Sequence, residues 1–156
     1  MPVPITPARY DAELAAAMTA DRQILQGLPT YLGIRTVEVG PARLIAELEV
    51  RDELLNPFGF AHGGVVAGLV DHVLGAVLYP VIERGQWAAT TEFKLNLVAA
   101  VRTGVLRAEA IIVAMSRRTA VVQIEVTNDG RLAALAQGTV LTPQRHPPDQ
   151  VAAGAE

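Results

Sequence analysis

The chain has 156 residues and a net charge of −3 at pH 7; 51% of its residues are hydrophobic and 19% are charged. This composition is typical of one folded domain with a substantial core, and the lack of a basic patch argues against nucleic-acid binding. The absence of cysteine excludes disulfides and cysteine-based zinc sites, and the histidines show no metal-ligand spacing, so no metal is expected.

The first 28 residues are predicted to form a helical extension. Apolar side chains recur at helical spacing over Pro7–Gln26, and Gly27 with Pro29 is predicted to end the helix. The N-terminus has no charged-then-apolar leader pattern, so the expected location is the cytoplasm.

Strands are predicted on both sides of one long apolar segment. The strand-like segments are Tyr31–Val39, Arg43–Val50, Trp87–Val98, Val105–Met115, Thr119–Thr127 and Leu132–Leu141. Trp87–Val98 alternates apolar and polar residues, and Asn128-Asp129-Gly130 marks a hairpin turn. An antiparallel sheet wrapped around one helix follows from this order, which is an α+β fold.

The long apolar segment is predicted to be a helix from Gly63 to Glu83. It is about long enough to span a bilayer, but it contains Asp71, His72 and Pro80. A central helix that the sheet buries nearly all round accounts for this composition better than a membrane span does. No membrane association is therefore expected.

Two glycines at the start of this helix and one acid within it indicate acyl-transfer chemistry. The backbone N–H groups of Gly63 and Gly64 can hold an oxyanion at a helix N-terminus. Asp71 is the one acid in the segment Val65–Val81, and a carboxylate in an apolar helix is unfavourable unless it has a task.

The spacing of Gly63 and Asp71 predicts that the site is shared between two chains. At about 1.5 Å per residue the two lie about 12 Å apart along the axis, too far to serve one carbonyl. If both take part, Asp71 meets the Gly63 N–H of a second chain. We therefore expect two antiparallel helices side by side in a homodimer, and an inactive monomer.

A stripe of small residues surrounds the acid. Gly64, Gly68 and Gly75 fall on the same side of the helix as Asp71. Glycine inside a helix costs about 1 kcal/mol relative to alanine, so these positions need a reason. The stripe leaves room for a ligand or for a neighbouring helix, and helix packing without chemistry is the alternative.

The same segment resembles a known family. Residues Asn56–Asp71 carry the pattern N-x5-H-G-G-x6-D, which closely resembles the hotdog-fold acyl-CoA thioesterases of the PaaI type. The segments Thr90–Asn96 and Ser116–Val121 also resemble a strand and a hairpin of that family. The order of elements matches from Gly27 to Leu141. The resemblance implies a hotdog domain at residues 29–142. The tail at 143–156 is rich in proline, polar and small residues and is predicted to be flexible.

The resemblance implies catalytic roles for residues of this pattern. Asp71 would be the nucleophile or general base, and the Gly63 N–H would polarise the thioester carbonyl. Asn56 would orient the thioester or the attacking water, and Thr90 would hold that water near Asp71. The sequence does not decide between the two roles of Asp71.

The resemblance also implies substrate contacts. His62, Gly64 and Gly68 would lie at the acyl-CoA site, and Arg117 and Arg118 would contact CoA phosphates, which arginine binds in a bidentate manner. Residues 98–100 read Val-Ala-Ala where many relatives have an Arg-Pro or similar pair. A CoA contact of the family is therefore expected to be missing there.

Each of these residues also has a simpler interpretation. His62 can be a structural residue at the helix start, and Asn56 before a proline can make a turn. Thr90 can be an ordinary strand residue, and Arg117 and Arg118 can be solvated hairpin charges.

The function implied by the resemblance is hydrolysis of an acyl-CoA thioester to a free acid and CoA, with no cofactor. A homodimer is the expected minimal active unit, and a homotetramer is the favoured assembly. One alternative is a non-catalytic acyl-CoA binding or sensing protein, since fold does not determine function. Another is an enoyl-CoA hydratase-like enzyme, whose D-x-N-P-x-H pattern is not matched because Asp52, Asn56 and His62 are too widely spaced. The acyl group is not defined by the sequence.

Overall fold

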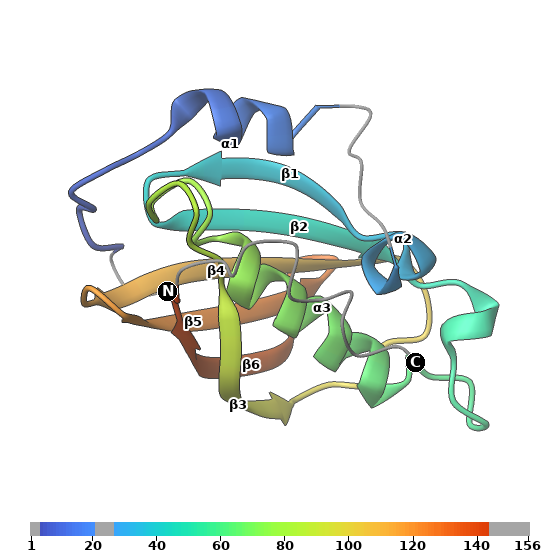
Figure 1. Cartoon of the computed structure of the whole chain (residues 1–156). Helices are drawn as coiled ribbons and strands as arrows, with labels where there is room; N and C mark the ends of the chain where they lie inside the picture. Colours follow the sequence, from blue (N-terminus) through green and yellow to red (C-terminus); the bar gives the residue numbers. More distant parts are fainter. Residues whose placement is uncertain (1–3, 21–26, 144–156) are drawn as a thin grey trace, which may run out of the picture.

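An antiparallel six-stranded sheet packs around one central helix in the computed structural model, which describes residues 4–20 and 27–143 (Figure 1). The strands are β1 Arg35–Gly40, β2 Arg43–Glu49, β3 Ala89–Leu97, β4 Val105–Met115, β5 Thr119–Asn128 and β6 Arg131–Leu141. Their order across the sheet is β1-β2-β4-β5-β6-β3, so β1 and β3 are its edges. The predicted α+β architecture is confirmed.

The predicted strand Tyr31–Val39 is wrong at its beginning. Residues Leu28–Leu32 form the short helix α2, and β1 begins only at Arg35. Pro29, expected to end a helix, lies in the first turn of α2, where the missing N–H of proline is not needed. Gly33 ends α2 in the left-handed conformation, at φ 75°.

The predicted helix over Pro7–Gln26 is much shorter in the structure. Helix α1 covers Ala12–Met18, and Asp11 caps its N-terminus by accepting a hydrogen bond from the Leu14 N–H at 3.0 Å. The segment before α1 is not helical, and backbone hydrogen bonds attach it to the rest of the molecule. Residues 21–26 of the predicted helix and the tail from residue 144 lie outside the described residues. Helix α1 lies beside the edge strand β1 (Figure 1).

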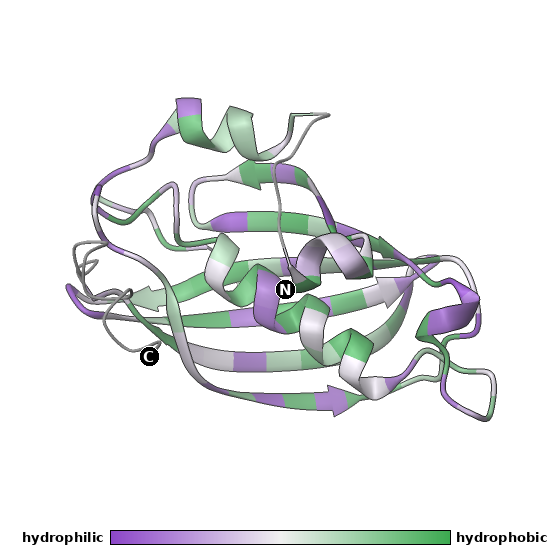
Figure 2. Ribbon diagram, turned by 45° about the vertical axis from the view of Figure 1, so that its right-hand side comes forward, coloured by the Kyte–Doolittle hydropathy of each residue, from purple (hydrophilic) through white to green (hydrophobic). Residues whose placement is uncertain are grey.

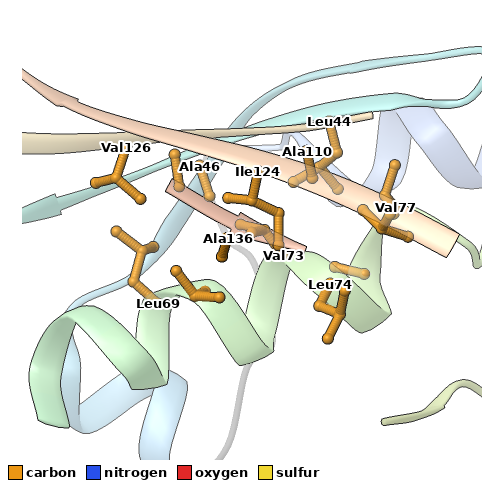
Figure 3. Close-up of a cluster of buried hydrophobic side chains, with 14 of the residues drawn as sticks. Leu44, Ala46, Leu69, Val73, Leu74, Val77, Ala110, Ile124, Val126 and Ala136 are labelled. Carbon is orange, nitrogen blue, oxygen red and sulfur yellow. The ribbon is translucent and has the colours of Figure 1, made fainter. Parts of the chain in front are cut away.

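The core lies between the central helix α3 (Gly63–Ala76) and the sheet. Large apolar side chains of α3 point toward sheet positions, several of which are alanine (Figure 3). The facing residues are Leu69, Val73, Leu74 and Val77 on or just after α3, and Ala46, Ala110, Ile124, Val126 and Ala136 on the sheet. Each buried leucine or valine contributes roughly 1.5–3 kcal/mol, so this interface fixes the helix on the sheet.

Gly138 on β6 allows the helix and β3 to approach closely. A Cβ atom at Gly138 would lie 2.6 Å from the Glu92 carbonyl oxygen and 2.9 Å from Leu74 Cδ2. A side chain at this position forces its surroundings to shift, because the closest neighbour is a backbone atom.

The predicted C-terminus of the central helix at Glu83 is wrong. Helix α3 ends at Ala76, and tighter turns follow, in which the Leu78 and Tyr79 N–H groups donate to the carbonyls three residues earlier. Pro80 has no N–H to donate to Ala76, so the α-helical pattern cannot continue. No helix among the described residues is long and apolar enough to cross a membrane.

The expectation that α3 is buried nearly all round is also wrong. His62, Gly64 and Asp71 are exposed, and Ala67 and Gly68 are half-buried. Figure 2 shows a hydrophilic break in the middle of the apolar helix, where the sequence has Asp71 and His72. One stripe of α3 therefore faces away from the sheet, and it is the stripe that carries the acid.

Candidate active site

His62 is the cap of α3, which confirms its structural interpretation. Its Nδ1 accepts a hydrogen bond from the Gly64 N–H at 2.9 Å, and its own N–H donates to the Leu54 carbonyl at 2.9 Å. The Gly64 N–H is therefore occupied by the His62 side chain. The Gly63 N–H has no acceptor among the described residues, so the structure leaves this one glycine donor free for a ligand.

The free Gly63 N–H lies at a small apolar pocket of about 260 Å³. The pocket is lined by the loop before α3, the first turn of α3, the end of β3 and the segment after it: Asn56, Phe60, Ala61, Gly63, Val66, Leu97, Val98, Ala99, Ala100, Val101 and Ala133. A hydrogen-bond donor in such apolar surroundings is worth more than the same donor in water. The pocket suits a carbonyl group that develops negative charge.

Asn56 shares this pocket and also makes a turn. Its Oδ1 accepts hydrogen bonds from the N–H groups of Phe58 at 2.9 Å and Phe60 at 3.2 Å. The turn interpretation is therefore correct for the side-chain oxygen. The Nδ2 group has no acceptor among the described residues and is the part of Asn56 that can donate to a ligand.

Asp71 and Thr90 do not line the pocket of Gly63. Asp71 is exposed, and its separation from Gly63 is about 12 Å from eight helical steps. Thr90 is an exposed residue of β3, paired with Val140 on β6. A Cβ atom at Gly75, one turn after Asp71, would lie 3.7 Å from the Ala88 Cβ just before β3. The side of α3 that carries Asp71 and Gly75 thus lies alongside the beginning of β3, the strand that carries Thr90.

Gly68 has a packing role. A Cβ atom there would lie 2.9 Å from Leu32 Cδ1 of α2 and 3.8 Å from Leu28 Cδ2. The short helix α2 therefore accounts for this glycine. At Gly64 a Cβ atom would lie 3.0 Å from His62 Nδ1, which places this glycine under the cap.

His72, the neighbour of the acid, is half-buried. Its Nε2 has no hydrogen-bond partner within residues 4–20 and 27–143. Burial lowers the pKa of His72, and the Asp71 carboxylate opposes that shift. The side chain is therefore neutral at neutral pH and does not neutralise Asp71.

Arg117 and Arg118 lie at the other end of α3. They line a second, larger pocket of about 1260 Å³ together with Val81, Ile82 and residues 5–9. The Gly63 pocket lies at the first turn of α3, and this second pocket lies beyond the other end of the helix, which is about 21 Å long over its 14 residues. Neither arginine forms an ion pair with another described residue. Sequence reasoning missed the N-terminal wall of this pocket, because no local pattern shows where an extension docks.

Arg102 is a further residue that sequence reasoning missed. Its guanidinium lies 4.0 Å from the centre of the Phe60 ring, and Phe60 lines the Gly63 pocket. A cation therefore stands beside this pocket although residues 98–100 supply none. Among the described residues no group of three or more histidine, aspartate or glutamate side chains could hold a metal ion.

An antiparallel sheet wrapped around one central helix is the architecture of the hotdog class of α+β proteins. Residues 58–134 match the family model of the thioesterase superfamily.

Relatives and solved structures agree with this class. The chain is 29% identical over 103 residues to a 1,4-dihydroxy-2-naphthoyl-CoA hydrolase of Listeria monocytogenes, covering 66% of this chain and 84% of the relative. It is 27% identical over 127 residues to human acyl-coenzyme A thioesterase 13, covering 81% and 88%. A conserved protein of Pseudomonas aeruginosa shares the fold at a TM-score of 0.74 with 28% identity, covering 80% of this chain and 99% of that one. The chain has the hotdog fold, and the family match and these relatives together support a thioester hydrolase.

Proposed function

We propose that the protein is an acyl-CoA thioesterase whose site combines Asp71 of one subunit with the Gly63 N–H of its partner. The observation that carries the proposal is the separation of the two groups in one chain. Gly63 and Asn56 share a pocket that Asp71 does not line, while Asp71 is exposed on the opposite half of the same helix. The two relatives described above are named as hydrolases of CoA thioesters, which supports CoA as the carrier of the acyl group.

An antiparallel pair of α3 helices would complete both sites at once. In such a pair, the first turn of each helix lies opposite the second half of the other, so each Asp71 approaches a free Gly63 N–H. Two features support this arrangement. Gly64 and Asp71 on this stripe of α3 are exposed. The edge strand β3 ends at Leu97, and Leu97 and the following Val98 are 57% and 54% exposed. Exposed apolar residues at a sheet edge favour burial against another copy. A pair of such dimers would form the homotetramer.

The chemistry of this site would proceed in one of two ways. As a general base, Asp71 takes a proton from a water molecule, and the resulting hydroxide attacks the thioester carbonyl carbon. As a nucleophile, an Asp71 carboxylate oxygen attacks that carbon, and water then hydrolyses the anhydride. In both, the Gly63 N–H stabilises the oxyanion, the C–S bond breaks, and the CoA thiolate leaves and takes up a proton. The Asn56 Nδ2 and the Thr90 hydroxyl would hold the thioester or the water.

Release of free CoA thiol from a panel of acyl-CoA substrates tests the proposal. The Asp71→Asn variant keeps the shape of the side chain, removes its charge and is expected to lose turnover by at least about 10²-fold, the lower range for general-base catalysis. Asp129→Asn is the matched control, because Asp129 is an exposed acid in the β5–β6 turn, where asparagine adopts the same backbone conformation.

Two outcomes would contradict the proposal. Near-normal hydrolysis by Asp71→Asn would remove the acid from the mechanism. Binding of acyl-CoA by the wild-type protein without thiol release from any substrate would favour the acyl-CoA binding or sensing alternative.

A further inference from the structure

The large pocket beyond the end of α3 is positively charged. Arginines 9, 117 and 118 line it, against one acid, Glu83. Part of the remaining lining is apolar, including Pro7, Met115 and Leu141. Its volume of about 1260 Å³ is above the roughly 300–1,000 Å³ of common small-molecule sites. The pocket therefore has the size, the charge and the apolar surface for a nucleotide.

The hairpin that carries Arg117 and Arg118 is held by a buried residue. Thr142, which is 3% exposed, donates its N–H to the Arg118 carbonyl at 2.9 Å and its hydroxyl to the Arg117 carbonyl at 3.4 Å. Ser116 Oγ accepts the Arg118 N–H at 3.2 Å. These hydrogen bonds fix the backbone of both arginines, while their guanidinium groups have no ion-pair partner among the described residues.

Arg9 is placed in the same pocket by two backbone anchors on either side of it. The Ile5 N–H donates to the Ile112 carbonyl at 3.2 Å, and the Asp11 N–H donates to the Pro80 carbonyl at 2.7 Å. Asp11 also forms a loose ion pair with Arg9, at 3.6 Å. The other carboxylate oxygen of Asp11 caps α1, so one side chain both caps the helix and contacts Arg9. The side chain of Arg9 remains 38% exposed and can reach a ligand.

We propose that Arg9 of the N-terminal extension is a phosphate ligand of the nucleotide end of CoA, which the family resemblance implies Arg117 and Arg118 contact in this pocket. The proposal rests on the acyl-CoA thioesterase function and adds a binding residue that lies outside the family-matched segment, residues 58–134. Arginine forms charge-assisted, bidentate hydrogen bonds with phosphate, and the apolar lining suits the adenine ring. In the proposed antiparallel dimer, the partner's Gly63 pocket would lie toward this end of α3, so one CoA thioester would span both.

Direct binding of adenosine 3′,5′-bisphosphate, measured by titration calorimetry without turnover, tests the pocket itself. Arg9→Gln is expected to weaken binding about five- to tenfold, the size of one partly exposed charge-assisted contact. Arg9→Lys keeps the charge and is expected to retain most of the affinity. The matched control is Arg35→Gln, an exposed arginine on β1, which is expected to change binding less than about twofold. Unchanged binding by Arg9→Gln, or an equal loss in Arg35→Gln, would overturn the proposal. Equally tight binding of inorganic phosphate would do so as well, since it would indicate a general anion site.

Kinetics provide the second test. Arg9→Gln is expected to raise the KM for an acyl-CoA while kcat stays unchanged, because Arg9 is remote from the reacting carbonyl. The same acyl group on pantetheine, which lacks the phosphates, is expected to show no difference between Arg9→Gln and wild type. An equal effect on both substrates would contradict a phosphate contact. If the wild-type protein hydrolysed no thioester, the proposed function would fail, while the calorimetric result would still decide whether Arg9 binds the nucleotide.

Discussion

Replacing Gly63 with proline removes the proposed oxyanion donor with little change in the backbone. Gly63 is the first residue of α3, the position at which helices most readily accept proline. A residue before proline must be extended, and His62 already is, with φ −63° and ψ 137°. The nearest obstacle to a new Cβ is Leu97 Cδ1 at 3.0 Å, the end of an exposed, flexible side chain. The variant is therefore expected to fold normally.

The expected effect on catalysis follows from the loss of one oxyanion donor. Such a loss lowers kcat by about 10²–10³-fold, or about 2.7–4 kcal/mol of transition-state stabilisation, and the KM for the acyl-CoA is expected to change little. The assay is thiol release at saturating substrate, with Tm and the far-ultraviolet spectrum as folding controls. Gly63→Ala keeps the N–H and is expected to remain within about fivefold of wild type, which isolates the donor from the Cβ contact. A proline variant that folds and retains more than about a tenth of the wild-type kcat would refute the role of this N–H.

Two further predictions test assembly and packing. A one-to-one mixture of Asp71→Asn and Gly63→Pro subunits, refolded together, is expected to recover about a quarter of wild-type activity. Half of the dimers are then mixed, and each mixed dimer has one intact site of two. If the site lay within one chain, the mixture would recover no activity. Gly138→Ala is expected to lower the free energy of unfolding by about 1–3 kcal/mol, measured by urea denaturation, because its Cβ would lie 2.6 Å from the Glu92 carbonyl oxygen. Gly40→Ala, whose Cβ would meet nothing within 4 Å, is the control, and an equal loss there would contradict the packing argument.

The sheet could be predicted from the sequence because its signals are local. Alternation and the turn at Asn128-Asp129-Gly130 predict β5 and β6, and the structure confirms that these strands pair around this turn. The errors lie where a local signal has two meanings. Pro29 can follow a helix or begin one, and in the structure it begins α2. The apolar run after Ala76 continues the pattern of a helix, but Pro80 cannot continue its hydrogen bonds.

The residues around the site show a further limit of sequence reasoning. The role of Gly68 depends on Leu32, a residue of α2 that is distant in sequence. Likewise, the pocket of Arg9, Arg117 and Arg118 exists only because the N-terminal segment is bound to β4 and to the turn at Pro80. Such meetings arise from the tertiary fold, and no spacing along the chain encodes them.

The three-dimensional structure also distinguishes between two residues that the sequence treats alike. Gly63 and Gly64 stand side by side at a helix start, and either N–H could hold an oxyanion. His62 Nδ1 accepts the Gly64 N–H, and this acceptor exists only while Nδ1 is unprotonated. The histidine cap therefore removes one donor and leaves the other at the apolar pocket beside Asn56. Under the proposed mechanism His62 would be a positioning residue, because it fixes the first turn from which the Gly63 N–H points.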